Sequence, residues 1–171
     1  MAIRYWKEKQ IFSIDTKNTT YQMKVDSYGF LLHLYYGAKV NGAMDYLLTY
    51  ADRGFSGNPA EAGADRTYSL DVLPQEYPTW GTGDYRNAAL LIQNADHSES
   101  CKLQYAGHTI KKGKYNLSGL PAVYAEENEA ETLEIYMEDC VSNLKVTLLY
   151  GVVEQLDIIT RSVIIENHGS E

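Results

Sequence analysis

Apolar and polar residues alternate with a period of two in several segments, and this pattern restricts the fold most. Residues 132–138 place Leu133, Ile135 and Met137 on one face and leave the other face for water. Residues 144–150 direct Leu144, Val146 and Leu148 inward in the same way. Further strands are expected at residues 11–15, 20–25, 30–36, 88–93, 102–108 and 157–166. So many short strands predict an all-β protein, an antiparallel β-sandwich.

Helices are nearly absent from the pattern. The best helical candidate, residues 125–131, has no apolar stripe, so an acidic, solvated loop is expected there. Short turns at residues 16–19 and 26–29 join the first three expected strands into a meander. The third of these strands, residues 30–36, is apolar on both faces and is expected to be central in a packed sheet.

A long irregular stretch, residues 37–86, interrupts the strands. It contains scattered glycines and prolines, and short strands are expected only near residues 67–70. Loops of this length inside a compact domain are unusual and often functional. The stretch is therefore the first place to look for a site.

Length and charge exclude several classes of protein. The chain has 171 residues, enough for a single domain at residues 1–171, and 44% of them are hydrophobic, enough for a core. The formal net charge of −8 argues against nucleic-acid partners and against anionic membrane surfaces. Since the sequence has no apolar run of signal-peptide or membrane-helix length, a cytoplasmic location is expected.

Few residues offer catalytic or metal chemistry. The four histidines, His33, His97, His108 and His168, are isolated in sequence, and His33 is expected to be half-buried and hydrogen-bonded. Cys101 and Cys140 lie far apart without metal-ligand spacing, so neither a zinc site nor a disulfide is expected. No nucleophile, metalloprotease or phosphate-loop motif is present. We therefore expect no metal and no cofactor.

Acidic, basic and aromatic residues recur together within the irregular stretch. They are Asp52, Arg53 and Phe55; Asp65 and Arg66; and Trp80, Asp84 and Arg86. An aromatic ring offers a flat apolar platform for a sugar, and a neighbouring Asp or Arg binds hydroxyl groups. The other interpretation is a structural loop, in which Asp–Arg pairs tie the stretch to the sheets. Residue types alone leave both interpretations open.

Four segments together resemble a known family. They are ADRGFSGNP (residues 51–59), DRTYSLDVLPQEYPTWGTGDYR (65–86), LPAVYAEENEAETLEI (120–135) and DIITRSVIIENHGSE (157–171). The chain is similar, over nearly its whole length, to the N-terminal region of bacterial α-galactosidases of glycoside hydrolase family 36. The resemblance implies a β-sandwich that is part of a β-supersandwich, like that of galactose mutarotase.

The resemblance also implies that the chemistry lies elsewhere. The family's catalytic aspartates sit in a (β/α)8 barrel, the nucleophile in a Lys-aromatic-Asp motif, and this sequence contains neither. The chain alone is thus expected to be inactive, as one region of an enzyme that acts on melibiose- and raffinose-type galactosides. The resemblance assigns contact with the terminal galactose of a neighbouring subunit, in a tetramer, to Asp52. Gly57, where many members carry proline, is a local departure from the family pattern.

The other residues of the stretch receive an assembly role from the resemblance. Arg53, Phe55, Asp65, Arg66, Trp80, Asp84 and Arg86 are expected to pack the loop against the barrel or a neighbouring subunit. Partners are then further copies of the chain and a galactose-containing oligosaccharide. The alternative is a stand-alone carbohydrate-binding or scaffold module without hydrolase activity.

Overall fold

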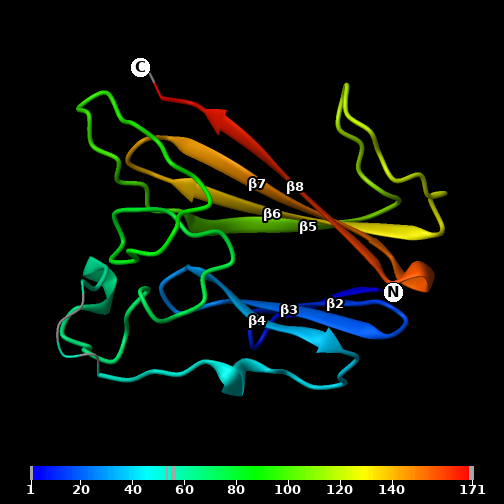
Figure 1. Ribbon diagram of the computed structural model, residues 1–171, viewed down its shortest axis with the longest axis horizontal. Helices are drawn as coiled ribbons and strands as arrows, with labels where there is room; N and C mark the ends of the chain where they lie inside the picture. Colours follow the sequence, from blue (N-terminus) through cyan, green and yellow to red (C-terminus); the bar gives the residue numbers. More distant parts are fainter. Residues whose placement is uncertain (1, 53, 55–56, 170–171) are drawn as a thin grey trace.

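Two four-stranded antiparallel sheets face each other in the computed structural model, which describes residues 2–52, 54 and 57–169 (Figure 1). The first sheet contains β1 (Ile3–Trp6), β2 (Ile11–Asp15), β3 (Thr19–Val25) and β4 (Leu31–Ala38) in that order. The second contains β5 (Gln104–Lys112), β6 (Ala130–Asp139), β7 (Leu144–Val153) and β8 (Ile158–Asn167). Within the described residues the only helices are single 3-10 turns at Asp45–Leu47, Ala60–Ala62 and Glu154–Leu156. The predicted all-β sandwich is confirmed.

The main core fills the space between the sheets. In the β6–β7 ladder Ile135 lies opposite Leu148 and Met137 opposite Val146, and all four side chains are buried. They pack into one cluster with residues of the first sheet such as Phe12. Removal of these side chains from water drives the two sheets together. The inward faces expected for residues 132–138 and 144–150 are confirmed.

The opposite face of β6 meets water only in part. Thr132 is 2% exposed. Its hydroxyl donates to Gly113 O at 2.8 Å and accepts from Tyr115 N at 3.0 Å, both in the segment after β5. The chain that follows β5 therefore covers the start of β6. The outward-facing Glu134, in contrast, is partly exposed and binds Lys111 at the surface. Alternation in sequence could not reveal the covering segment.

A second, smaller core explains why β4 is apolar on both faces. Leu31 belongs to the main core, whereas Leu32 packs on the irregular stretch with residues such as Tyr68 and Leu70. The expectation that this strand is central was wrong, since β4 is the last strand of its sheet. Its outer edge is covered instead by the loop, where His33 N donates to Pro74 O at 2.7 Å and Glu76 N to Leu31 O at 2.9 Å.

Two expected strands are missing and one was not expected. Residues 88–93 form no strand, and only a single bridge joins Leu90 to Thr79. Leu90 and Ile92 pack on the main core while Leu91 is exposed, so the apolar run anchors a loop. Residues 67–70 form no strand, and Tyr68 and Leu70 pack in the small core. The short strand β1 was missed because four residues are too few to show a period.

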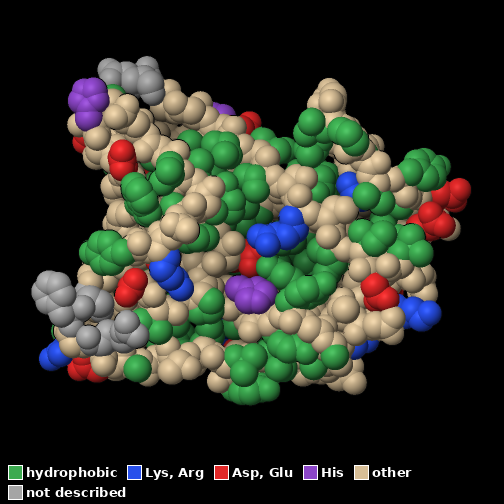
Figure 2. Space-filling view, viewed as in Figure 1, with side chains coloured by type: hydrophobic (Ala, Val, Ile, Leu, Met, Phe, Trp, Pro, Cys, Tyr) green, Lys and Arg blue, Asp and Glu red, His purple; other side chains and the backbone are tan. Residues whose placement is uncertain are grey.

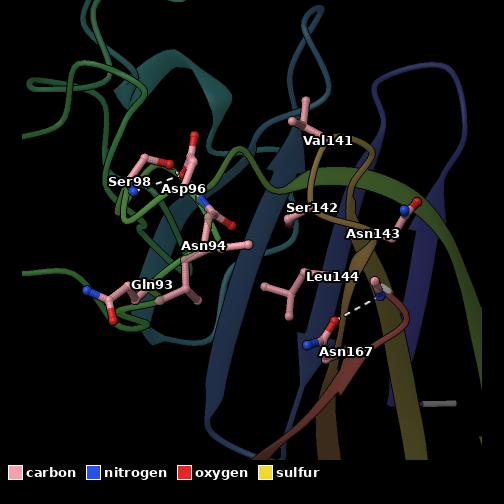
Figure 3. Close-up of a pocket in the computed structure, with 12 residues that line it drawn as sticks. Gln93, Asn94, Asp96, Ser98, Val141, Ser142, Asn143, Leu144 and Asn167 are labelled. Carbon is pink, nitrogen blue, oxygen red and sulfur yellow. Dashed lines mark hydrogen bonds between the residues drawn. The ribbon is translucent and has the colours of Figure 1, made fainter. Parts of the chain in front are cut away.

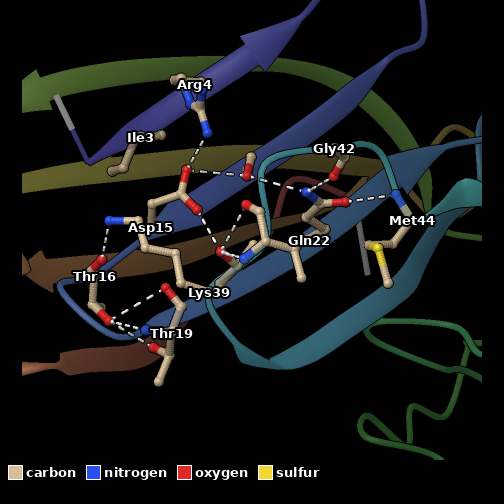
Figure 4. A network of polar contacts seen from close by, with 12 residues as sticks. Ile3, Arg4, Asp15, Thr16, Thr19, Gln22, Lys39, Gly42 and Met44 are labelled. Carbon is tan, nitrogen blue, oxygen red and sulfur yellow. Dashed lines mark hydrogen bonds and ion pairs between the residues drawn. The ribbon is translucent and has the colours of Figure 1, made fainter.

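A buried polar network covers the outer face of the first sheet (Figure 4). Asp15 accepts bonds from Arg4 at 2.6 Å and from Thr20 at 2.6 Å. Gln22 donates to Gly42 O at 2.9 Å and accepts from Met44 N at 2.9 Å. Since buried polar groups need partners, these bonds fix the path of residues 39–44 over the sheet. The first residues of the irregular stretch are thus held on the outer face of the first sheet.

Candidate functional site

Asp52 lies on the surface with its carboxylate held from one side. Oδ1 accepts the backbone N–H of Gly54 at 2.7 Å and lies 3.2 Å from Nη2 of Arg66. Nη2 of Arg66 also reaches Gly54 O at 3.3 Å, so the arginine bridges the turn. Oδ2 accepts no hydrogen bond from the part of the chain that the structure describes. Half of the Asp52 side chain is exposed. Arg53 and Phe55 lie outside the described residues.

Asp65 shapes the loop beside Asp52. Its Oδ1 accepts the Thr67 backbone N–H at 2.9 Å and the Thr67 hydroxyl at 2.7 Å. These bonds stabilise the charged form and lower the pKa of Asp65. The Asp65 carbonyl accepts Asn58 Nδ2 at 2.8 Å, which joins both sides of the intervening loop. Asp65 therefore shapes the turn that contains Arg66, and the guanidinium of Arg66 contacts Asp52.

Asp84 and Arg86 turn into the protein. Asp84 is 3% exposed and accepts Nε and Nη2 of Arg86 at 2.8 and 2.7 Å. Nη2 of Arg86 also donates to the carbonyls of Leu70 and Leu73, at 2.7 and 2.8 Å. Burial alone would raise the pKa of Asp84, but the hydrogen bonds from Arg86 and Gln75 lower it. This pair ties two parts of the irregular stretch to each other, whereas the structural interpretation expected a tie to the sheets.

Two glycines bring the end of the stretch close to Gly57, the residue that follows the undescribed pair 55–56. Nearby, Trp80 Nε1 donates to Arg86 O at 3.3 Å, and Trp80 is 37% exposed. Gly83 has φ +86°, and a Cβ there would lie 2.1 Å from the carbonyl oxygen of Gly57. Only glycine allows such an approach. Gly83 and Gly57 are consequently neighbours.

Glu76 is the centre of a cluster that sequence reasoning missed. Its side chain is 2% exposed and accepts the hydroxyls of Tyr21, at 2.6 and 2.7 Å, and of Tyr150, at 2.8 Å. Nη2 of Arg161 lies at 2.6 Å and Nδ1 of His33 at 3.4 Å. Figure 2 shows histidine, acidic and basic side chains gathered at the centre of one face, with hydrophobic side chains around them. The half-buried, paired position expected for His33 is confirmed.

The cluster joins both sheets to the loop. Tyr21 and His33 come from β3 and β4, whereas Tyr150 and Arg161 come from β7 and β8. Burial alone would raise the pKa of Glu76, but its bonds to His33, Arg161 and the two phenols lower it. Burial together with the nearby Glu76 charge raises the phenol pKa of Tyr150. Such shifts keep the Glu76 carboxylate charged and the phenols of Tyr21 and Tyr150 protonated. The cluster therefore suits a structural role, in which it holds the two sheets and the loop together.

A separate hollow of about 440 Å³ lies between residues 92–98, the start of β7 and the end of β8 (Figure 3). Asn94 Nδ2 donates there to Ser98 Oγ at 3.0 Å and to Ser100 O at 2.9 Å. Asn167 Oδ1 accepts Gly169 N at 2.8 Å. These bonds stabilise the surrounding turns.

Among the described residues no group of three or more His, Cys, Asp or Glu side chains is placed to hold a metal ion. No described helix is long and apolar enough to cross a membrane.

Comparison with known proteins decides the family. The profile of the glycosyl hydrolase family 36 N-terminal domain matches residues 29–171. The chain belongs to this family. It is 61% identical over 170 residues to the bifunctional α-galactosidase/sucrose kinase AgaSK of Mediterraneibacter gnavus, covering 99% of this chain and 18% of that protein. The α-galactosidase AgaA of Geobacillus stearothermophilus is 42% identical over 175 residues, covering 100% of this chain and 24% of that protein.

Solved structures agree with the family 36 assignment. The galactosidase domain of AgaSK matches with a TM-score of 0.96, over 98% of this chain and 23% of that one. Variants of AgaA match in complex with raffinose, at a TM-score of 0.87, and with stachyose, at 0.88. Each is 42% identical and covers 93% or 94% of this chain and 22% of its own. The chain thus spans about a fifth to a quarter of these relatives, and the resemblance inferred from sequence is confirmed.

Proposed function

We propose that the chain is the non-catalytic N-terminal β-sandwich region of a retaining α-galactosidase, and that it lends Asp52 to a sugar bound by a neighbouring subunit. Family membership and the α-galactosidase relatives support this assignment. The observation that carries it is the geometry of Asp52, whose Oδ1 is fixed by Gly54 and Arg66 while the carboxylate remains half-exposed. An oriented, accessible carboxylate accepts hydrogen bonds from vicinal hydroxyls without any proton transfer.

The chemical step is assigned to a part of the enzyme outside residues 1–171. A retaining glycosidase needs two carboxyl groups roughly 5 Å apart on either side of the scissile bond. The two most buried carboxylates of the irregular stretch, Glu76 and Asp84, are each bound to arginine and to other donors. They are engaged in structure and have no open side. The substrates of the whole enzyme would be melibiose- and raffinose-type galactosides.

The sandwich also has a surface suited to assembly. On β8, the last strand of its sheet, Val163, Ile164 and Ile165 are 38–48% exposed. Apolar edge strands invite pairing with further polypeptide. We assign this edge and the irregular stretch to contacts with the catalytic barrel and with other subunits of a homo-oligomer, a tetramer in the cytoplasm.

A chimeric enzyme tests the proposal. This chain would replace the matching segment of AgaSK from Mediterraneibacter gnavus, which is 61% identical. We expect the chimera to hydrolyse an α-galactoside and the isolated chain to hydrolyse none. Because a hydrogen bond to a charged group is worth about 1.5–3 kcal/mol, Asp52→Ala should lower kcat/KM by roughly 10- to 100-fold. Glu138→Gln, which changes a surface carboxylate of β6 outside this loop, serves as a control and should have a much smaller effect.

Each part of the proposal has its own failing result. Hydrolysis by the isolated chain would contradict the non-catalytic role. An unchanged kcat/KM in the Asp52→Ala chimera would remove Asp52 from the sugar site while leaving the assembly role intact. Millimolar galactose binding by the isolated chain, measured by calorimetry, would favour the stand-alone carbohydrate-binding module.

A further inference from the structure

Asn41 and Gly42 form the one Asn-Gly pair of the sequence. Asparagine is a thermolabile residue, because the backbone nitrogen of the next residue can attack its side-chain carbonyl carbon. Glycine in the next position hinders this attack least, since it has no Cβ and its backbone is permissive. The pair is therefore the first place in the chain to look for a spontaneous covalent modification.

Both reacting groups are exposed and unengaged. Asn41 and Gly42 lie in a bend at the surface. Within the part of the chain that the structure describes, neither the Asn41 side-chain amide nor the Gly42 N–H has a hydrogen-bond partner. A Cβ built at Gly42 would meet nothing within 4 Å, so the space around the pair is open. The amide of Asn18, by contrast, is held at 2.7 Å by Asp157.

We propose that Asn41 is a deamidation site, which reacts through a cyclic imide with Gly42. A base in the solvent removes the proton of the Gly42 N–H, and this nitrogen forms a bond to Cγ of Asn41. The Cγ–Nδ2 bond breaks, and the side-chain nitrogen takes up a proton and leaves as ammonia. No oxidant, reductant or cofactor takes part.

Water then opens the imide at one of its two carbonyl carbons. The hydroxyl group of the water adds to that carbon, and its hydrogen returns to the glycine nitrogen. Opening at Cγ gives aspartate at position 41. Opening at the main-chain carbonyl carbon gives isoaspartate, whose backbone runs through Cγ and is longer by one methylene group.

The backbone around the pair is anchored to the first sheet, so the product affects stability. Gln22 Nε2 donates to Gly42 O, and Gln22 Oε1 accepts from Met44 N, both at 2.9 Å (Figure 4). On the other side of Asn41, Val40 N donates to a threonine hydroxyl of β3 at 3.2 Å. An extra methylene between these anchors moves Gly42 O and Met44 N away from Gln22. Because Gln22 is 0% exposed, water cannot replace the lost partners.

Ageing of the purified chain in mildly alkaline buffer tests the proposal. Peptide mapping by mass spectrometry should show loss of the amide at position 41 while Asn18 keeps its amide, and an isoaspartyl methyltransferase should label the product. A synthetic peptide of residues 38–44 is the reference for the unrestrained reaction. Gly42→Ala should slow the conversion at least about tenfold and leave the fold intact, because its Cβ lies in open space but crowds the attacking nitrogen.

Urea denaturation of the aged chain measures the structural consequence. The isoaspartate fraction should unfold at a midpoint roughly 0.5–1 M lower than the fresh chain, because Gln22 loses its partners. Freshly prepared Asn41→Asp keeps the normal backbone length and should unfold as the fresh chain does.

The site and its consequence fail separately. An intact amide at position 41 after the peptide has fully converted, or equal rates for Gly42→Ala and its parent, would overturn the assignment of the site. An unchanged midpoint for the isoaspartate fraction would overturn the link to the Gln22 anchor.

Discussion

Replacement of Glu76 by glutamine should strongly destabilise the protein. Glutamine keeps the shape of the side chain but removes the charge that binds two phenols, His33 and Arg161. The new amide group would also place a donor against the hydroxyls of Tyr21 and Tyr150, which already donate. Both sheets and the loop lose their common anchor in one substitution.

The size of the loss follows from the burial of each partner. Removal of one member of a buried ion pair costs about 3–5 kcal/mol, and a hydrogen bond to a charged group is worth about 1.5–3 kcal/mol. Because the Arg161 side chain is 49% exposed, water compensates for part of its lost contact. We therefore expect Glu76→Gln to lower the free energy of unfolding by about 2–4 kcal/mol.

Urea denaturation, followed by circular dichroism, measures this loss. With a slope of about 2 kcal/mol per molar, the midpoint should fall by roughly 1–2 M urea. Glu138→Gln is the matched control, because Glu138 pairs with Lys145 at 3.3 Å on the surface and should contribute less than about 1 kcal/mol. Equal midpoints for the two variants would refute the argument that Glu76 joins the sheets.

The pH dependence gives an independent check. The folded state lowers the pKa of Glu76, so its contribution is complete above the unfolded value of about 4.3 and is lost as the pH falls through the folded value. The stability gap between wild type and Glu76→Gln should be full at pH 7 and should close below about pH 4. A gap that stayed constant into strong acid would contradict a charged Glu76.

Three further predictions concern single side chains. Gly83→Ala should cost at least about 1 kcal/mol more than Gly119→Ala in urea denaturation, because both have positive φ but only a Cβ at position 83 meets a carbonyl. Burial lowers the pKa of His108, so stability should fall as the pH drops below about 6.5, and His108→Gln should reduce that slope in pH-dependent unfolding. Burial raises the pKa of the Cys101 thiol to about 12, whereas Cys140 is exposed. A thiol reagent should therefore label Cys140 in the folded chain and Cys101 only after denaturation, and rapid labelling of both would show that the core is open.

The sequence predicted many of the strands of the sandwich. Residues 11–15, 20–25 and 144–150 lie in strands as expected, because each has one face in the main core. Residues 88–93 form a loop instead of the expected strand, since an apolar run that packs a loop onto the core has the composition of a strand. Tertiary packing decided between a strand and a loop here, because Leu90 and Ile92 pack on the main core.

The candidate site was predictable only in its residue types. Asp52 and Arg66 were singled out, but their contact across the Gly54 turn required coordinates. Glu76 lies between two prolines in an aromatic loop, which was the one available signal. Its partners come from four different strands, and no local pattern connects them.

The Glu76 cluster also bears on how the chain is made. Tyr21 and His33 leave the ribosome well before Arg161, which follows much later in the chain. At roughly 5–20 residues per second, about 6–25 s separate the synthesis of His33 from that of Arg161. During that time the first hairpins expose the apolar face that later packs in the main core, and the Glu76 carboxylate lacks Arg161. Chaperones can bind the nascent chain in this interval.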